Sequence, residues 1–301
     1  RASTKIMVMV KAFAYGSGST EIANILQYHK VDYLGVAYAD EGIELRKNNI
    51  KLPIMVMNPS EESFEAIMSH ALEPEIYSFR IFRALLLYLN GNPCKIHLKL
   101  DSGMHRLGFE ERDITELVSI LKVNLNIQVA SIFSHLAGAD ESGHDTFSRE
   151  QGNKFMRWAD AITNSLGYKP LYHILNSSGI LRLPDLQLDM VRLGIGLYGV
   201  DPTTEGFNQL QPVATLKTII SQIKHIKQGE TIGYGRRGIA QKDVTIATIA
   251  IGYADGFSRA FSRGVGEVLI HGKRAKVIGN VCMDMTMVDV TEIDAKEGDE
   301  A

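Results

Sequence analysis

Short apolar runs alternate with longer segments of helical period from Ile6 to Arg192. In the longer segments the apolar residues recur every three or four positions, as Ile22, Ile25 and Leu26 do, which is typical of helices packed on one face. We expect the apolar runs to form strands over Ile6–Val10, Tyr33–Ala37, Ile54–Met57, Glu75–Ser78, Ile96–Leu100, Val129–Ser134, Tyr172–Leu175 and Leu188–Val191. We expect helices over segments such as Thr20–His29, Asp40–Asn48, Glu61–His70, Phe79–Leu89 and Glu110–Lys122.

Eight strands separated by helices indicate an α/β fold, and their number favours a closed (β/α)8 barrel of parallel strands. An open, doubly wound sheet is the alternative, because periodicity alone does not say whether a sheet closes. In a barrel, side chains at the carboxyl ends of the strands converge on one site. Residues that end or follow the expected strands are therefore the first candidates for chemistry.

After Pro212 the pattern changes to strands joined by Gly-rich turns, with little helical period. We expect these strands over Val213–Ile226, Val244–Ile251, Val268–Ile270, Lys276–Ile278 and Thr286–Val290. The sequence therefore predicts two domains, a barrel over residues 1–205 and a mostly β domain over residues 206–301. The chain begins at Arg1 rather than at a methionine and ends soon after the last expected strand, so we expect each domain to be truncated at its outer end.

The composition is that of an ordinary soluble globular protein, with 45% hydrophobic and 22% charged residues. The formal net charge is −3, and no basic run or basic amphipathic helix is present, which argues against a nucleic-acid or membrane partner. No apolar run approaches the ~18 residues that a membrane span requires. Cys94 and Cys282 lie outside any CxxC spacing, and a reducing cytoplasm is the simplest interpretation. The nine histidines show no metal-ligand spacing, so we expect no metal site.

The first candidate for chemistry is Lys11, which ends an apolar strand and precedes a loop containing Gly16 and Gly18. On spacing alone, a charged residue leaving a strand into solvent is the simpler explanation. At the carboxyl end of a barrel strand, however, a partly desolvated lysine can lose its proton and attack an aldehyde to form a Schiff base. Spacing leaves both explanations open.

Three further candidates lie at the ends of expected strands. Asp101 begins a tight loop that carries Arg106, although Asp101 could equally serve only to form the turn. Asn176 and Ser177 follow the expected seventh strand, and the run Arg192–Ile195 follows the eighth. The loops after strands seven and eight are the usual phosphate site of such barrels, and a hydroxyl with free backbone N–H groups suits that role.

In the second domain, Tyr253 lies in a Gly-rich turn, where an isolated tyrosine is usually structural. The run Gly233–Gly238 matches the letters of the dinucleotide-binding fingerprint. Strand-like sequence follows this run where a helix should begin, so we expect a turn between strands rather than a nucleotide site.

The candidate motifs also occur in a specific order. They are Lys-Ala-x-Ala-Tyr-Gly at Lys11, Asp-x-Gly-Met-x-Arg at Asp101, Asn-Ser at Asn176, Arg-x-Gly-Ile-x-x-Tyr-Gly at Arg192, Gly-Tyr-Ala-Asp-Gly at Gly252 and Cys-Met-Asp at Cys282. In this order they resemble the alanine racemase family over essentially the whole chain. The resemblance implies a barrel followed by a β domain, the cofactor pyridoxal phosphate and a head-to-tail homodimer with shared active sites. It implies interconversion of L-alanine and D-alanine, which supplies D-alanine for cell-wall peptidoglycan.

The resemblance also implies a set of cofactor-binding residues. Lys11 would form the Schiff base, and Tyr15 and Ser177 would bind the phosphate together with backbone groups at the eighth strand end. Arg192 would face the pyridine nitrogen, supported by His135. The whole set is Lys11, Tyr15, His135, Asn176, Ser177, Arg192, Gly194 and Ile195.

For the substrate, the resemblance implies that Arg106 binds near the carboxylate and hydrogen-bonds a catalytic tyrosine. That tyrosine would be Tyr253, the second acid/base, which reaches into the site of the partner subunit, and Met283 would line the same entrance. Lys99 matches a lysine that is carbamylated in several members, where the new carboxylate positions the arginine. A lysine and a tyrosine on opposite faces of the substrate suit a two-base racemisation.

Some positions depart from the family pattern. Ser17 stands where the family usually has histidine, and Phe13 where it usually has asparagine. A C-terminal tyrosine that contacts the phosphate in the family has no match before the chain ends. We expect the first two departures to alter hydrogen bonds around the site rather than the chemistry.

Other functions stay open at this point. A serine or broad-specificity racemase is the main alternative, because pocket width depends on residues that the sequence does not place. A cofactor-carrier protein on the same barrel, with a homeostatic role, would lack the second domain. A fold-related amino-acid decarboxylase would have a Gly-rich phosphate loop and a carboxylate at the ring nitrogen, and neither is found.

Overall fold

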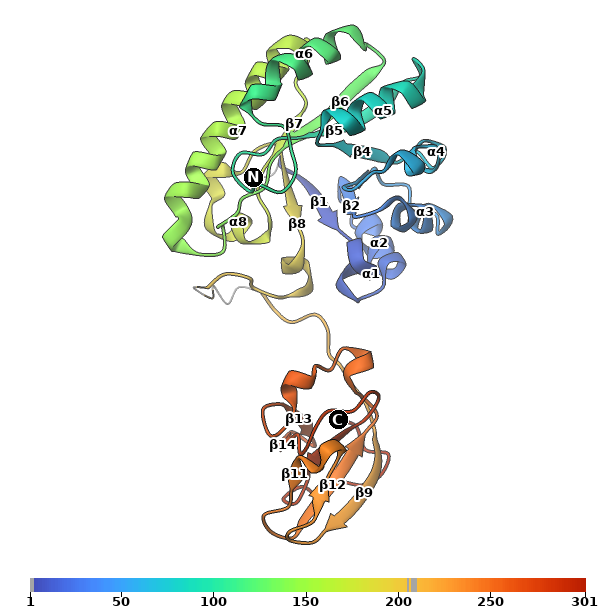
Figure 1. Cartoon of the computed structure of the whole chain (residues 1–301), viewed down its shortest axis with the longest axis vertical. Coiled ribbons are helices and arrows are strands. Elements are labelled where there is room, and N and C mark those ends of the chain that lie inside the picture. Colours follow the sequence, from blue (N-terminus) through green and yellow to red (C-terminus); the bar gives the residue numbers. More distant parts are fainter. Residues whose placement is uncertain (1–2, 205, 207–209) are drawn as a thin grey trace. The chain divides into compact units, whose positions relative to one another are not determined.

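The computed structural model describes residues 3–204, 206 and 210–301, and it divides into two compact units, Arg1–Ala214 and Thr215–Ala301 (Figure 1). In the first unit, strands alternate with helices, as the spacing of the apolar runs predicts. The strands are β1 (Lys5–Met9), β2 (Tyr33–Val36), β3 (Ile54–Val56), β4 (Glu73–Ile76), β5 (Cys94–Lys99), β6 (Ile127–Phe133), β7 (Leu171–His173) and β8 (Met190–Leu193). The helices are α1 (Lys11–Tyr15), α2 (Ser19–Tyr28), α3 (Ala39–Lys47), α4 (Phe64–Ser69), α5 (Phe79–Leu89), α6 (Ile114–Val123), α7 (Asp145–Leu166) and α8 (Ser177–Arg182). Short 3-10 turns are η1 (Glu61–Ser63), η2 (Glu111–Asp113), η3 (Ser142–His144), η4 (Pro184–Leu186) and η5 (Ile195–Tyr198).

The eight strands form one parallel sheet in the order β7-β6-β5-β4-β3-β2-β1-β8. Backbone hydrogen bonds join its two edge strands. The N–H of Asp189 donates to the carbonyl of Tyr172 at 3.1 Å, and the N–H of Arg192 donates to the carbonyl of Leu175 at 3.0 Å. The sheet is therefore a nearly closed barrel, which confirms the predicted fold of this part of the chain.

Alternation along the strands separates two apolar clusters. Side chains on the outer face of the strands, such as Val8 and Leu34, pack in the cluster that includes the helices. Side chains on the inner face, among them Met7, Met55 and Phe133, form a separate cluster inside the barrel. The same alternation directs polar residues of the strands into the barrel interior.

Two helices of the first unit differ from expectation. The 22-residue helix α7 has no counterpart among the predicted helices, because polar Ser148 and Gln151 lie on its buried face and interrupt the apolar stripe. Helix α1 is a single turn in the left-handed conformation, with φ between 51° and 57° over residues 12–15. Nothing in the sequence of that turn predicts a left-handed backbone.

Strand ends also shift by one to two residues. Strand β1 ends at Met9, so Lys11 begins the turn α1 instead of ending the strand. Strand β8 extends to Leu193, which places Arg192 within the strand rather than after it. Both residues stay at the carboxyl end of the barrel.

The second unit is mostly strand, as predicted. Strands β9 (Ile220–Ile226), β12 (Val244–Ile249) and β15 (Thr286–Asp289) form an antiparallel sheet in the order β15-β12-β9. Strands β13 (Glu267–Ile270) and β14 (Lys273–Lys276) form a hairpin, and β10 (Thr231–Ile232) pairs with β11 (Gly238–Ile239). The 3-10 turns are η6 (Tyr234–Arg236), η7 (Tyr253–Asp255) and η8 (Arg259–Phe261).

Two sequence predictions are decided in this unit. The run Gly233–Gly238 is a turn between two strands, as expected, because η6 links β10 to β11. The strand expected from Val213 begins only at Ile220, where β12 supplies a pairing partner. Across the described ranges, each helix is too short or too polar to cross a lipid bilayer.

Candidate active site

A cavity of about 350 Å³ lies at the carboxyl end of the barrel strands. It is lined by Met9, Lys11, Tyr15, Met57, Arg106, His135, Asn176, Ser177, Ser178, Arg192, Gly194, Ile195 and Pro202. All of the site residues that the sequence assigns to the barrel line this cavity, with the exception of Lys99. Segments that are far apart in the sequence therefore meet at one place.

Lys11 is carried by the left-handed turn α1. Such a turn costs about 1–2 kcal/mol for each residue that is not glycine, so other contacts must hold it. One carboxylate oxygen of Glu41 on α3 accepts the backbone N–H of Ala12 at 2.7 Å. The other oxygen accepts the N–H groups of Ala37 at 2.6 Å and Tyr38 at 3.1 Å. Glu41, which the sequence analysis missed, therefore ties the lysine-bearing turn to the start of α3.

Hydrogen-bond donors converge beside Ser177. The backbone N–H groups of Gly194 and Gly196 donate to its hydroxyl oxygen at 3.0 and 3.2 Å. A β-carbon at Gly194 would lie 2.8 Å from the hydroxyl oxygen of Tyr15, so glycine permits this close approach. Burial raises the pKa of Tyr15, which keeps its hydroxyl protonated and able to donate. Asn176 caps the start of α8 by accepting a backbone N–H at 3.0 Å. Together these groups form an uncharged cradle suited to an anion.

Arg192 is buried and held by several acceptors. Its Nη2 donates to the carbonyl of Ser134 at 2.7 Å and to Nδ1 of His135 at 3.1 Å. Its Nη1 donates to Nδ1 of His173 at 2.6 Å, and the guanidinium lies 5.1 Å from the ring centre of Phe133. Burial lowers the pKa of Arg192 to about 10, so the side chain is still a cation at neutral pH.

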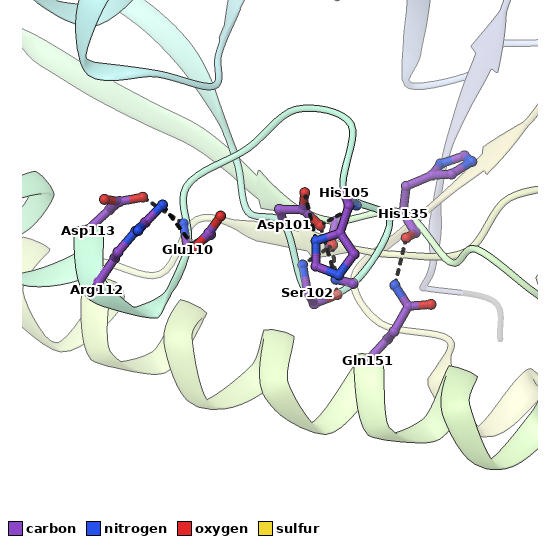
Figure 2. Close-up of polar contacts among 10 residues, drawn as sticks. Asp101, Ser102, His105, Glu110, Arg112, Asp113, His135 and Gln151 are labelled. Atoms are coloured by element: carbon purple, nitrogen blue, oxygen red, sulfur yellow. Dashed lines mark hydrogen bonds and ion pairs between the residues drawn. The ribbon is translucent and has the colours of Figure 1, made fainter.

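His135 is fixed at its backbone by Gln151 of α7, as Figure 2 shows. Nε2 of Gln151 donates to the His135 carbonyl at 3.1 Å, and its Oε1 accepts the N–H of Ala137 at 2.9 Å. Burial, followed by the charge of Arg192, lowers the pKa of His135 to about 2. A neutral imidazole can offer Nδ1 as an acceptor to the arginine.

The loop that carries Arg106 is shaped by Asp101. The carboxylate of Asp101 accepts the N–H groups of Gly103 at 3.0 Å and of His105 at 2.9 Å, and Figure 2 shows it turned toward this loop. The turn-forming explanation of Asp101 therefore describes its contacts. Arg106 is exposed and lines the cavity.

Lys99 on β5 does not line the cavity; it is buried beside Glu75 on β4. Its Nζ lies 3.4 Å from Oε1 of Glu75. Burial raises the pKa of Glu75 to about 7, and burial also lowers the pKa of Lys99. Carbamylation of Lys99 stays a prediction.

Tyr253 and Met283 lie together in the second unit. The backbone N–H of Tyr253 donates to the carbonyl of Cys282 at 3.0 Å, and that of Ala254 donates to the carbonyl of Met283 at 2.9 Å. A β-carbon at Gly252 would lie 2.2 Å from the Met283 carbonyl oxygen, so glycine allows the two loops to meet. The exposed fractions of Tyr253 and Met283 are 40% and 55%, so both side chains are accessible to solvent.

Polar residues that face the barrel interior from β4 to β7 are the main set that the sequence analysis missed. They are Glu73, Glu75, His97, Ser131 and His173, all buried. The signal that could have found them is a polar residue at alternate positions of an otherwise apolar strand. Their place in the alternation predicts that they point inward, although it does not say which of them meet.

The lining of the cavity defines its chemistry. Lys11, Arg106 and Arg192 supply positive charge, and none of the described residues that line the cavity is acidic. The hydroxyls of Ser177 and Tyr15 can donate to one anionic group, and Lys11 offers an amine. Such a site suits an anionic ligand with a carbonyl group that an amine can attack.

Two family descriptions match the chain. Residues 1–202 match the alanine racemase N-terminal domain, and residues 213–301 match the alanine racemase C-terminal domain. The alanine racemase of Clostridium tetani is 39% identical over 309 residues, which cover 98% of this chain and 78% of the relative. That of Clostridium kluyveri is 39% identical over 305 residues, with 98% and 77% covered.

Solved structures agree with this assignment. The alanine racemase of Clostridium difficile 630 superposes with a TM-score of 0.93 at 37% identity, covering 100% of this chain and 80% of that one. The alanine racemase of Bartonella henselae with covalently bound pyridoxal phosphate superposes with a TM-score of 0.87 at 28% identity, covering 99% and 83%. With both domains matched and the same fold in its relatives, this chain belongs to the alanine racemase family of enzymes.

Proposed function

We propose that this enzyme interconverts L-alanine and D-alanine with pyridoxal phosphate, using Lys11 and Tyr253 as its two acid/base residues. The observation that carries the proposal is the cavity in which Lys11 meets the anion cradle at Ser177 and the buried cation of Arg192. These are the groups that a phosphorylated aldehyde requires. In the cytoplasm, the D-alanine formed would supply cell-wall peptidoglycan.

The residues of the cavity fit this cofactor. Its phosphate would be held by the hydroxyls of Ser177 and Tyr15 and by the backbone N–H groups of Gly194 and Ile195, with the N–H of Gly194 exchanging its bond to Ser177 for one to the phosphate. Lys11 would hold its aldehyde carbon. The approach of Tyr15 to Gly194, which a β-carbon would obstruct, supports a cradle built for a compact anion. When bound, pyridoxal phosphate acidifies the hydrogen on the α-carbon of the substrate by conjugating that carbon to its ring.

Arg192 would face the ring nitrogen of the cofactor. Its hydrogen bonds to the described residues all use Nη1 and Nη2, so its Nε–H would be available to the ring nitrogen. A guanidinium that stays charged cannot accept a proton from the ring nitrogen, so it favours proton exchange at the α-carbon over proton addition to the cofactor. Arg106, exposed at the cavity, would bind the carboxylate of alanine.

Lys11 and Tyr253 would act on opposite faces of the substrate. One removes the α-hydrogen and the other supplies a proton to the opposite face, which inverts the carbon, and the roles exchange in the reverse reaction. We propose that Tyr253 acts in the site of a second chain, in a head-to-tail homodimer. The exposure of Tyr253 and Met283 on the second unit supports this arrangement.

The proposal is tested by assaying purified enzyme with L-alanine, D-alanine and L-serine. We expect racemisation of alanine in both directions, and loss of both directions in Lys11→Ala. Lys154→Ala, which changes an exposed lysine on α7, is the matched control and should keep wild-type rates. Faster turnover of serine than of alanine would show that serine, and not alanine, is the preferred substrate.

The cofactor is tested separately from turnover. Borohydride reduction followed by peptide mapping should attach the reduced cofactor to the peptide that contains Lys11. Ser177→Ala should raise the concentration of pyridoxal phosphate that is needed for half-saturation, because the phosphate loses a hydroxyl partner. Reduction products on other lysines alone would rule out the assigned role of Lys11.

A further inference from the structure

A chain of buried hydrogen bonds runs from Arg192 through the barrel interior to Glu73. Nη1 of Arg192 lies 2.6 Å from Nδ1 of His173, and Nε2 of His173 lies 2.9 Å from Oγ of Ser131. Oγ of Ser131 lies 2.7 Å from Nδ1 of His97, whose Nε2 lies 2.9 Å from Oε2 of Glu73. All five residues are buried, and they come from four neighbouring strands, β4 to β7, and from β8.

The direction of these hydrogen bonds is fixed at the Arg192 end. A guanidinium only donates, so Nδ1 of His173 accepts and the hydrogen of its neutral ring sits on Nε2. Burial lowers the pKa of His173 well below the usual value, and the charge of Arg192 acts in the same sense, which keeps the ring neutral. The Nε2–H of His173 must then donate to Ser131.

The other end of the chain is fixed by Glu73. Burial alone would raise the pKa of this carboxyl group, but the hydrogen bond from His97 holds it below the usual value. An ionised carboxylate only accepts, so the Nε2–H of His97 donates to it. Nδ1 of His97 lies on the other side of Ser131, within hydrogen-bond distance of its hydroxyl.

Ser131 is therefore the one link whose hydrogen bonds join the two imidazoles. A hydroxyl has two acceptor sites and one hydrogen, so it can accept the Nε2–H of His173 whichever way its bond to His97 runs. Without that oxygen, the Nε2–H of His173 would be buried and unpaired, and the imidazole would lose the hydrogen bond that holds it from that side. The other tautomer gives no relief, because a hydrogen on Nδ1 would point at the guanidinium of Arg192.

We propose that Ser131 is a positioning residue of the racemisation, because its hydroxyl accepts the Nε2–H of His173 and so holds that imidazole with Nδ1 against Arg192. The inference rests on the proposed function, in which Arg192 faces the ring nitrogen of the cofactor. Ser131 does not line the cavity and acts only through His173 and Arg192.

The tautomer can be observed without cofactor or turnover. In cofactor-free enzyme with nitrogen-15-labelled histidine, we expect the shifts of His173 to report a neutral ring with hydrogen on Nε2. Ser131→Ala should keep this tautomer but move the Hε2 signal upfield, because its hydrogen bond is lost. The signals that are missing in the His173→Gln variant are those of His173. A hydrogen on Nδ1, or a charged ring, in the wild-type protein would overturn the proposal whether or not any variant folds.

The kinetic arm compares two buried serines. Ser131→Ala should lower kcat about ten-fold with little change in KM, in line with the loss of one buried hydrogen bond, and Ser131→Thr should restore most of it. Ser148→Ala is the matched control, because Ser148 is equally buried and its hydroxyl has no hydrogen-bond partner among the described residues.

The outcomes separate the inference from the proposed function. If the wild-type enzyme does not racemise alanine, the proposed function fails, while the tautomer measurement still decides the role of Ser131 toward His173. If the enzyme racemises alanine but Ser131→Ala and Ser148→Ala behave alike in both measurements, the inference alone is wrong.

Discussion

The ammonium nitrogen of Lys99 lies 3.4 Å from a carboxylate oxygen of Glu75 in the interior of the barrel. Both side chains are almost fully buried, and the oxygens of Glu75 accept no hydrogen bond from the described residues. Each charge is therefore stabilised mainly by the other, because water cannot reach the pair.

The pair should behave as a unit when it is mutated. Glu75→Leu alone should destabilise the enzyme by about 3–5 kcal/mol, because it leaves the Lys99 amine buried without its partner. The double variant Glu75→Leu with Lys99→Met should recover most of that loss, and denaturant unfolding measures both. A double variant as unstable as the sum of the two single variants would contradict a coupled pair.

Carbamylation of Lys99 should depend on the charge of Glu75. The reaction requires a neutral amine and creates an anion, and a neighbouring carboxylate opposes both. With carbon-13-labelled bicarbonate, we expect a stronger carbamate signal in Glu75→Gln than in the wild-type enzyme, and none in Lys99→Met. A weaker signal in Glu75→Gln would show that Glu75 promotes the modification.

Replacing Ala12 with glycine should reduce the backbone strain of the left-handed turn α1. Ala12 is exposed with φ of 52°, and Ala12→Gly removes steric strain that exceeds the added flexibility of the unfolded chain. We expect a gain of about 0.5–1 kcal/mol in the free energy of unfolding. Ala161→Gly, at an exposed position of the right-handed helix α7, should lose about 1 kcal/mol. Equal losses in the two variants would contradict strain in the turn.

The buried histidine His135 should make the cofactor-free enzyme sensitive to acid. Its pKa is lowered to about 2 in the folded state, so below a pH of about 6.5 only the unfolded chain takes up the proton. Stability therefore falls as the pH drops below that value. His135→Gln should reduce this slope by about 1.4 kcal/mol per pH unit, measured by denaturant unfolding between pH values of about 6 and 4.5. An unchanged slope would show that His135 is protonated when folded.

Much of this architecture was predictable from the spacing of apolar residues. The helix over Phe79–Leu89 has the expected bounds, and each of the barrel strands forms within a few residues of its predicted range. Periodicity succeeds here because buried strands are short and apolar and are separated by amphipathic helices. Helix α7 was not predicted, because polar Ser148 and Gln151 lie on its buried face and interrupt the apolar pattern.

The candidate site was predictable only in part. Motifs at strand ends and the family resemblance indicated Lys11, Ser177 and Arg192, and the structure brings them to one cavity. The contacts that hold these residues in place could not be predicted from the sequence. Glu41 acts from the following helix, and the meeting of Ser131 with two histidines depends on the stagger of neighbouring barrel strands, which no local pattern encodes.

The central claim, that Lys11 of one chain and Tyr253 of another complete each site, is tested most directly by mixing two inactive variants. Lys11→Ala lacks the amine, and Tyr253→Phe lacks only the acidic hydroxyl. A mixed dimer would hold one site with both defects and one with neither, so random pairing should restore about a quarter of wild-type activity. If conditions that are shown to exchange subunits restore no activity, the two residues do not share a site between chains.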